Sequence, residues 1–196
     1  MGLFSSSDLK KAEIPAKGSF RKSPGKSKVI LANTADQLKQ LIAELEPETN
    51  YHFSTGGAWS LHDMIAMTCQ KIGPSRLFLS TWTITEEPMR VLFQLIREGW
   101  ITELNCLFDY RIEKRKADAF QLAKVNASKV KLSKSHAKVA VLISNDWGVS
   151  IVGSANLSKN PRIEAGVLST CISDSEFHSG WITNEITHGN TFRKHT

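Results

Sequence analysis

The residues of this chain best suited to chemistry fall in two short motifs. His136 and Lys138 stand two residues apart, and none of the other five histidines is followed by a lysine at that spacing. The second motif, Gly153-Ser154-Ala155-Asn156, comes later in the same strand-rich stretch. On an extended strand, residues two apart point to the same face, about 6.6–6.8 Å from each other. We therefore expect His136 to project with Lys138, and Ser154 with Asn156.

These residue types suit attack on a phosphodiester. An unprotonated imidazole can attack phosphorus and form a covalent intermediate, which divides one difficult displacement into two easier ones. A lysine ammonium and an asparagine amide can stabilise the negative charge that develops on the non-bridging oxygens. Because the protein itself supplies the positive charge, we expect neither a metal nor another cofactor.

With both motifs in this order, the chain resembles the phospholipase D superfamily. The signature of that family is H-x-K, four residues, an aspartate, six residues and G-S-x-N. His136, Lys138, Gly153, Ser154 and Asn156 match it. The resemblance implies that His136 is the nucleophile and that Lys138, Ser154 and Asn156 bind the phosphate oxygens of the substrate.

The chain departs from the signature at the aspartate. Counted forward from Lys138, the family's spacing places the aspartate at position 143, which is Ile143. Counted back from Gly153, the same signature places it at Asp146. Residues 138–143 and 148–153 are patterned as strands, and the segment between them has the composition of a hairpin turn. A longer hairpin absorbs three extra residues without moving either strand end. Asp146 is therefore the candidate equivalent, with a structural role.

The family also carries a glutamate after the asparagine, and Glu164 is the matching candidate here. It opens an apolar run at residues 165–172, which is patterned as a strand. We expect Glu164 to support the site by orienting His136 or Lys138 through hydrogen bonds, as carboxylates commonly do for imidazoles.

The chain contains one H-x-K motif, whereas the family's reaction uses two. One histidine attacks phosphorus and the other protonates the leaving oxygen. A chain of 196 residues with one copy resembles the homodimeric members, in which two subunits form one active site. A two-fold interface is self-complementary, so it can bring the same residue of each subunit to the axis. We therefore predict a homodimer.

Strands that alternate with helices predict an α/β sandwich with a mixed central sheet flanked by helices, and the resemblance implies that this fold is phospholipase D-like. We assign it to residues 29–196. Thr34, Ser60 and Thr85 are the expected helix caps. The expected strands cover residues 28–33, 51–55, 76–84, 103–112, 128–133, 138–143, 148–153 and 165–172, and the expected helices begin near residues 35, 61, 86 and 117, with a closing helix near 177–186.

The charge is basic, with 25 Lys and Arg against 19 Asp and Glu, a net +6. Seven of the basic residues lie in residues 1–28 among Ser, Gly and Pro, which predicts a flexible basic arm before the domain. A second group, between residues 111 and 134, leads into the H-x-K motif. This distribution favours a polyanionic partner, either nucleic acid or anionic lipid.

Other classes of protein fit the sequence less well. No apolar run approaches the ~20 residues of a membrane span, so we expect no stable membrane insertion. Cys69, Cys106 and Cys171 are widely spaced in apolar surroundings, which predicts reduced core residues of a cytoplasmic protein. No His, Cys or carboxylate set has the spacing of a zinc site.

Three functions remain open from the sequence. The leading hypothesis is a metal-independent endonuclease that cleaves DNA or RNA, since the chain resembles the compact single-motif nucleases of the family. The second is a phospholipid phosphodiesterase or transphosphatidylase, which uses the same motif. The third is a catalytically weak nucleic-acid-binding module on the same scaffold, because a fold does not guarantee activity.

Overall fold

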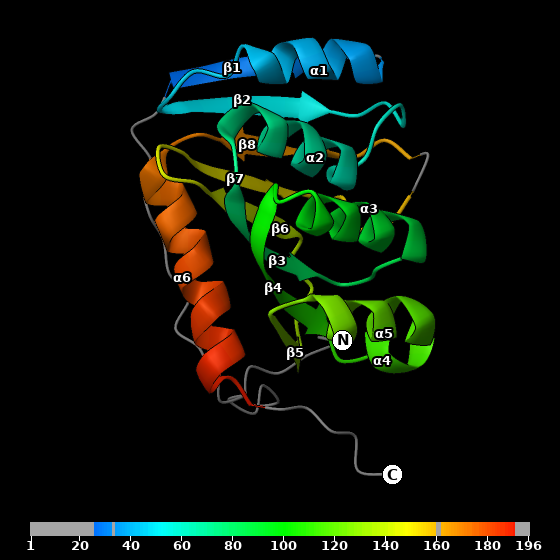
Figure 1. Ribbon diagram of the computed structural model, residues 1–196. Coiled ribbons are helices and arrows are strands. Elements are labelled where there is room, and N and C mark those ends of the chain that lie inside the picture. The colour runs from blue at the N-terminus through cyan, green and yellow to red at the C-terminus, as the bar shows by residue number, and fades with distance from the viewer. Residues whose placement is uncertain (1–25, 33, 160–161, 191–196) are drawn as a thin grey trace, which may run out of the picture.

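The computed structural model describes residues 26–32, 34–159 and 162–190. In these residues eight strands form one mixed sheet, in the order β1-β2-β8-β7-β6-β3-β4-β5 (Figure 1). The strands are β1 (Lys26–Leu31), β2 (Thr49–Ser54), β3 (Ser75–Thr81), β4 (Ile101–Asp109), β5 (Lys129–Ser133), β6 (Val139–Ile143), β7 (Gly148–Gly153) and β8 (Ala165–Ser169).

The strand directions give the sheet two chemically different edges. β6 and β8 run antiparallel to their neighbours, and the other six strands share one direction. At one edge, which we call the carboxyl edge, those six strands end and β6 and β8 begin. At the opposite edge, which we call the hairpin edge, β6 turns into β7 (Figure 1, left).

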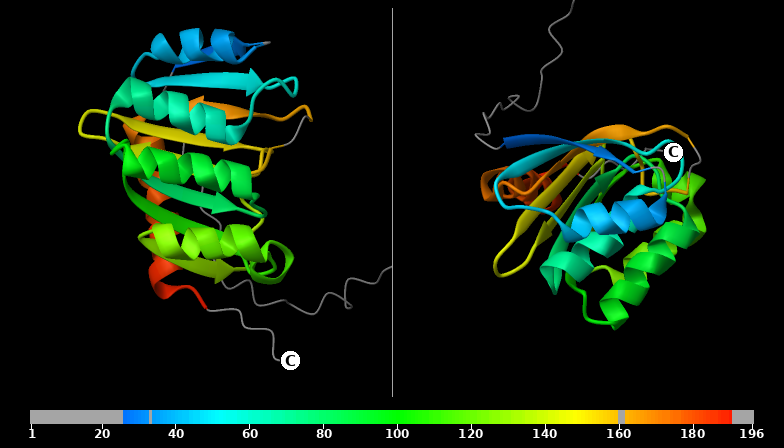
Figure 2. Two further views of the ribbon diagram at one scale, coloured as in Figure 1. Left: turned by 45° about the vertical axis from the view of Figure 1, so that its right-hand side comes forward. Right: turned by 90° about the horizontal axis from the view of Figure 1, so that it is seen from above.

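Helices cover both faces of the sheet. α1 (Ala35–Ala43), α2 (Leu61–Ile72), α3 (Glu86–Arg97) and α5 (Ala117–Asn126) lie on one face, and α6 (Ile172–His188) crosses the other (Figure 2). α6 packs against β3–β7. A short helix, α4 (Ile112–Arg115), precedes α5. The predicted α/β sandwich with a mixed central sheet is confirmed.

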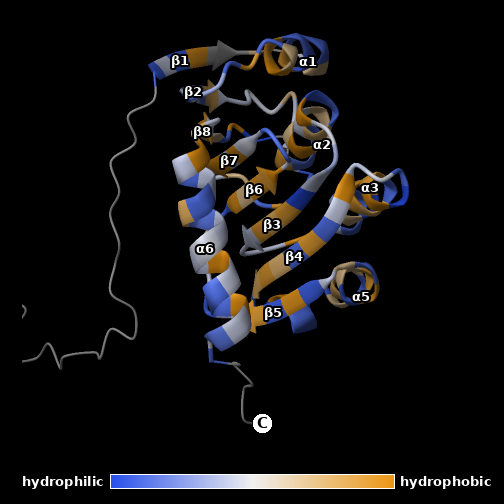
Figure 3. Cartoon of the chain, turned by 60° about the vertical axis from the view of Figure 1, so that its left-hand side comes forward, coloured by the Kyte–Doolittle hydropathy of each residue, from blue (hydrophilic) through white to orange (hydrophobic). Residues whose placement is uncertain are grey.

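The sheet separates two cores. Leu77 and Leu79 of β3 point toward the face covered by α1, α2, α3 and α5, and both are fully buried. Phe78, between them, points to the other face and packs with Val141 and with Ile182 of α6. Because the central strands are covered on both faces, their sequences are nearly continuous hydrophobic runs (Figure 3). Burying one such side chain contributes about 1.5–3 kcal/mol.

α1, α2, α3 and α5 begin where the sequence predicts, whereas α6 begins at Ile172, five residues before the predicted closing helix. Thr34 caps α1, since its hydroxyl accepts a hydrogen bond from the backbone N–H of Gln37 at 3.2 Å. Ser60 and Asp63 form a capping box at the start of α2. Thr85 occupies the cap position of α3, but its side chain makes no capping bond and its buried Oγ1 has no partner among the described residues.

Three strands end earlier than their sequence patterns predict. β8 ends at Ser169, so the strand prediction for residues 170–172 was wrong, and Ile172 begins α6. β3 ends at Thr81, where the hydroxyl donates to the carbonyl of Thr83 at 2.9 Å. β4 ends at Asp109, whose carboxylate accepts the backbone N–H of Arg111 at 3.1 Å. An aspartate that bonds to the backbone two residues on is a turn signal. The strand predictions for residues 82–84 and 110–112 were wrong.

The beginning of the chain differs from the predicted division at residue 28. Residues 1–25 of the predicted arm lie outside the described residues, and β1 starts at Lys26. Lys28 forms a 2.6 Å ion pair with Glu46. The described domain therefore begins three residues before residue 29.

The three cysteines, Cys69, Cys106 and Cys171, are buried and unpaired, as the sequence predicts. Burial raises the pKa of the Cys69 thiol to about 12. Within the described ranges, no helix has the length and apolar character needed to cross a membrane.

Candidate functional site

The two motifs meet at the carboxyl edge of the sheet. His136 and Lys138 immediately precede β6, and Gly153 ends the adjacent antiparallel strand β7. Together they surround an open hollow of about 420 Å³. Its lining residues are His136, Ala137, Lys138, Val139, Val152, Gly153 and Ser154. The structure thus brings three of the predicted site residues, His136, Lys138 and Ser154, to one hollow.

His136 and Lys138 are in direct contact, as their spacing predicts. The Lys138 ammonium lies 3.3 Å from Nδ1 of His136 and donates to the carbonyl oxygen of the same residue at 2.8 Å. His136 is exposed, and Lys138 is half-buried. An ammonium can only donate, so the side-chain contact needs Nδ1 as an acceptor. In the neutral ring the proton then lies on Nε2.

The environment of Lys138 is unfavourable for a charge. Its side chain lines a void of about 10 Å³ with Phe53 and Trp59, so part of it is removed from water. This burial lowers the pKa of Lys138 from 10.5, and the negative charge of Glu164 opposes the shift. Lys138 therefore loses its proton at a lower pH than an ordinary lysine does.

Ser154 is positioned by the close approach of β7 and β8. Gly153 pairs with Gly166, and a Cβ on Gly153 would lie 2.7 Å from the carbonyl oxygen of Ala165. The absence of a side chain there explains the glycine of the motif. Ser154 donates its hydroxyl proton to the Glu164 carboxylate and accepts the backbone N–H of Ala165 at 3.1 Å. The predicted supporting residue Glu164 thus reaches the site through Ser154.

Asn156 belongs to the segment that leaves β7 and is fixed beside the end of β3. Thr81 Oγ1, which donates its proton to the carbonyl of Thr83, lies 3.4 Å from the side-chain oxygen of Asn156 and accepts the backbone N–H of Leu157 at 3.2 Å. Thr85 donates its backbone N–H to the carbonyl of Leu157 at 3.1 Å. These bonds hold the whole segment at the carboxyl edge. Contact between Asn156 and a phosphate stays a prediction.

Asp146 lies elsewhere. It is exposed in the turn between Ile143 and Gly148, at the hairpin edge. This turn is closed by Ser144, which donates its backbone N–H to the carbonyl of Trp147 at 2.9 Å. The hairpin matches the prediction. The length of β6 and β7 separates Asp146 from the hollow, and Asp146 is not among the residues that line it.

The segment before the H-x-K motif is anchored to β3. The Ser135 hydroxyl lies 3.0 Å from that of Ser80, which is fully buried, and it accepts the backbone N–H of Ala137 at 3.3 Å. These bonds fix the path of the chain on both sides of His136. They give the exposed imidazole a rigid support.

The sequence analysis missed an aromatic residue at the site. The ring of Trp82 lies 5.3 Å from that of His136, measured between centroids, and the Lys138 ammonium lies 5.8 Å from the Trp82 ring centroid. The guanidinium carbon of Arg111 lies 5.3 Å from the same centroid. Arg111 is paired with Asp109 through Nε at 2.6 Å and Nη2 at 3.1 Å.

The position of these residues in the chain was the available signal. Trp82 directly follows the buried strand β3, and Arg111 lies two residues beyond the end of its neighbour β4. In open α/β sheets, ligands bind beyond the carboxyl ends of the strands. Among the described residues, no group of three or more His, Cys, Asp or Glu side chains is arranged to hold a metal ion.

Comparison with known proteins gives matches in structure and not in sequence. No protein-family model matches the chain, and no curated protein does. Nuc from Salmonella typhimurium, a phospholipase D family member, has a similar structure, with a TM-score of 0.52 and 14% identity over 74% of this chain and 98% of its own. NucT from Helicobacter pylori matches with a TM-score of 0.53 and 16% identity, over 71% of this chain and 97% of its own.

A third similar structure belongs to a larger protein. Polyphosphate kinase from Porphyromonas gingivalis has a TM-score of 0.50 and 12% identity over 74% of this chain, which corresponds to 27% of the kinase. At these identities the likeness is one of fold. It agrees with the superfamily that the two motifs predict: the chain has the phospholipase D fold.

Proposed function

We propose that this chain with the phospholipase D fold is a metal-independent phosphodiesterase that cleaves nucleic acid as an endonuclease. The observation that carries the proposal is the hollow at the carboxyl edge, where His136, Lys138 and Ser154 meet. The net charge of +6 favours a polyanionic substrate. The resemblance to compact single-motif nucleases of the superfamily supports the same substrate class.

In the first step, a ring nitrogen of His136 attacks phosphorus, a P–N bond forms, and the P–O bond to the leaving oxygen breaks. Lys138 must first move away from Nδ1. If Nδ1 attacks, its lone pair must first be released by the ammonium. If Nε2 attacks, the ring proton lies on Nδ1, and Nδ1 can then no longer accept a hydrogen bond from the ammonium. The phosphate oxygens provide the alternative partner for Lys138. Asn156 and Ser154 bind the remaining non-bridging oxygens.

The second histidine comes from another copy of the chain. The partner's His136, as an imidazolium, gives its proton to the leaving oxygen. It then takes a proton from water while the water oxygen attacks phosphorus and the P–N bond breaks. Proton transfer by a positioned histidine contributes about 10²–10⁴-fold to the rate. In this scheme Glu164 acts through Ser154 and through its charge near Lys138.

The test is cleavage of single-stranded DNA, duplex DNA and RNA in excess EDTA. The parent protein and His52→Ala should cleave at least one of these substrates, whereas His136→Ala should cleave none. His52 is an exposed histidine on β2 and serves as the matched control. Activity that disappears in EDTA and returns with magnesium contradicts the proposal. Binding without cleavage by the parent favours a nucleic-acid-binding module, and hydrolysis of phospholipid vesicles alone favours the lipid enzyme.

The dimer has its own test. Parent protein is mixed with increasing amounts of His136→Ala under conditions that exchange subunits. Each mixed dimer has one histidine in its shared site, so activity should fall faster than simple dilution predicts. Full activity in a species that sediments as a monomer contradicts the shared site. The predicted cytoplasmic location remains an expectation, based on three unpaired cysteines.

A further inference from the structure

A second cation lies beside the hollow, beyond the residues of the two motifs. Arg111 follows the end of β4, and its side chain is 37% exposed, whereas the side chain of its partner Asp109 is only 3% exposed. The carboxylate therefore lies inside the protein, and the guanidinium is the outer end of the pair. Asp109 binds the Nε and Nη2 side of the guanidinium, and this pairing leaves Nη1 for another acceptor.

The Trp82 indole connects this cation to the catalytic motif. Arg111 and Lys138 each lie within 6 Å of the Trp82 ring centroid, and the His136 ring lies 5.3 Å from it. The Arg111 guanidinium and the Lys138 ammonium are therefore separated by no more than the sum of their distances to the Trp82 ring centroid. Cations are held over an indole by its quadrupole, and Asp109 fixes the guanidinium from behind. The site thus presents two cations beside one indole.

We propose that Arg111 binds the phosphate next to the one that is cleaved, so that the substrate is a strand with at least two successive phosphodiesters. This inference rests on the proposed function and specifies its substrate class. Lys138 holds the scissile phosphate against His136, and Arg111 holds its neighbour one nucleotide along the strand. A substrate with one phosphodiester, such as a phospholipid, makes the first contact and not the second.

Further exposed basic residues next to Arg111 indicate the direction in which the nucleic-acid strand leaves the hollow. Lys114 and Arg115 of α4 follow Arg111 almost directly, and both are exposed. Positively charged grooves that track the backbone are typical of proteins that bind single strands. A preformed guanidinium loses little entropy when it binds, because its ion pair with Asp109 already restricts its rotamers.

The experiment compares two nucleotides of the same base in EDTA. One is a dinucleoside monophosphate, with one phosphodiester, and the other is a trinucleoside diphosphate, with two. The parent should prefer the second by about 10- to 100-fold in kcat/KM, the effect expected of one charge-assisted hydrogen bond. In Arg111→Gln the ratio of the two kcat/KM values should fall toward one, because the loss falls on the trinucleoside. Arg76→Gln, at the other end of β3, removes an exposed arginine far from the site and should behave as the parent does.

Removal of Arg111 leaves the buried carboxylate of Asp109 without its ion pair, which is destabilising. The same comparison is therefore repeated in Asp109→Asn/Arg111→Gln, where the pair is neutral, and both variants are checked by thermal melting. A folded variant that keeps the preference for the trinucleoside overturns the assignment of Arg111. An equal loss on both compounds also overturns it, because Arg111 then acts through the geometry of Trp82 and His136. A parent that cleaves DNA or RNA in EDTA but neither short compound overturns the inference, because two phosphodiesters then do not suffice. A parent that cleaves none of these substrates rejects the proposed function itself.

Discussion

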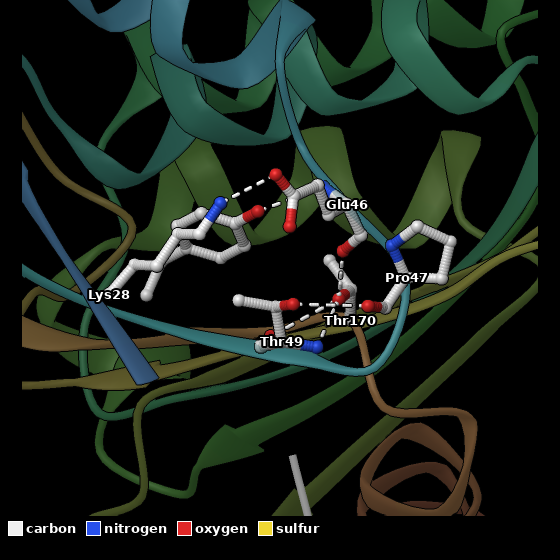
Figure 4. A network of polar contacts seen from close by, with 6 residues as sticks. Lys28, Glu46, Pro47, Thr49 and Thr170 are labelled. Carbon is white, nitrogen blue, oxygen red and sulfur yellow. Dashed lines mark hydrogen bonds and ion pairs between the residues drawn. The ribbon is translucent and has the colours of Figure 1, made fainter. Parts of the chain in front are cut away.

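The two edges of the sheet carry polar clusters of opposite kinds. At the hairpin edge, Thr49 and Thr170 are almost fully buried and bonded to each other (Figure 4). The Thr170 hydroxyl accepts the backbone N–H of Thr49 at 2.9 Å and donates to the carbonyl of Glu46 at 2.6 Å. The hydroxyl of Thr49 donates to the carbonyl of Pro47 at 3.0 Å. This cluster is closed, since protein groups satisfy its donors and acceptors.

At the carboxyl edge the cluster is open. His136 is exposed, Lys138 is partly desolvated, and the buried Nε1 of Trp82 has no hydrogen-bond partner among the described residues. Burying a polar group without a partner costs free energy. The closed cluster therefore stabilises the fold, whereas the open one, in the function we propose, receives its partners from the substrate. The difference predicts that substitutions at the two edges have opposite consequences.

The largest contrast is between His136→Ala and Thr170→Val. His136→Ala should reduce cleavage to background and leave the melting temperature unchanged, because the side chain is exposed. Thr170→Val should reduce the free energy of unfolding by about 1–3 kcal/mol, the cost of leaving buried groups unsatisfied, and leave kcat/KM unchanged below its melting temperature. Denaturation curves and cleavage rates of the same preparations decide this. Parental activity in His136→Ala, or parental stability in Thr170→Val, would remove the distinction between the edges.

The next largest effect concerns the phosphate-binding residues. Lys138→Ala and Asn156→Ala should each lower kcat by about 10²–10³-fold, the usual cost of one contact to charge that develops in the transition state. Steady-state kinetics on one oligonucleotide separate the parameters. If KM alone changes in both variants, these residues bind substrate and transition state equally, and their proposed role is wrong.

A smaller effect concerns the protonation of Lys138 at the carboxyl edge. Because burial lowers the pKa of Lys138 from 10.5, cleavage should fall as the pH rises through that lowered value, when the ammonium is lost. Lys138→Arg should move this alkaline limb to higher pH, since a guanidinium keeps its proton. Glu164→Gln should move it to lower pH, because the Glu164 charge raises the pKa of Lys138. Profiles of log kcat/KM against pH report the free enzyme, and profiles that coincide in all three proteins would rule out this assignment of the limb.

The smallest expected effect on turnover is that of the N-terminal residues. Residues 1–25 carry five lysines and arginines, and the deletion has to stop before β1, which begins at Lys26. Binding to duplex DNA should weaken at low salt, and the slope of log K against log salt should decrease by about 0.9 for each of these residues that contacts a phosphate. The value of kcat should not change. An unaltered salt slope argues against an arm that binds nucleic acid.

The sequence was sufficient for local features and for the motifs. His136, Lys138 and Gly153 lie where the strand pattern and the hairpin predicted, because a two-residue spacing and a turn are short-range properties. The glycine of the second motif has a steric reason in the structure, the close approach of Ala165. Asp146 was identified as part of the hairpin, and the structure keeps it there.

Trp82 and Arg111 were missed for a physical reason. Their apolar neighbours continue the strand pattern, so the turns that end β3 and β4 at Thr81 and Asp109 were not recognised. The approach of these residues to His136 also depends on the pairing of β3 with β6 and with β4, across long stretches of chain. The hydrophobic pattern of one strand does not determine which strand lies next to it.

The most direct test of the central claim is the stereochemical course at phosphorus. The substrate is an oligonucleotide with one phosphorothioate of defined configuration at the cleaved position, and the reaction runs in EDTA with isotopically labelled water. Two successive displacements, through a phosphohistidine on His136, predict retention of configuration. Inversion would show a single attack by water and would contradict the account, whatever the activity of the His136 variants.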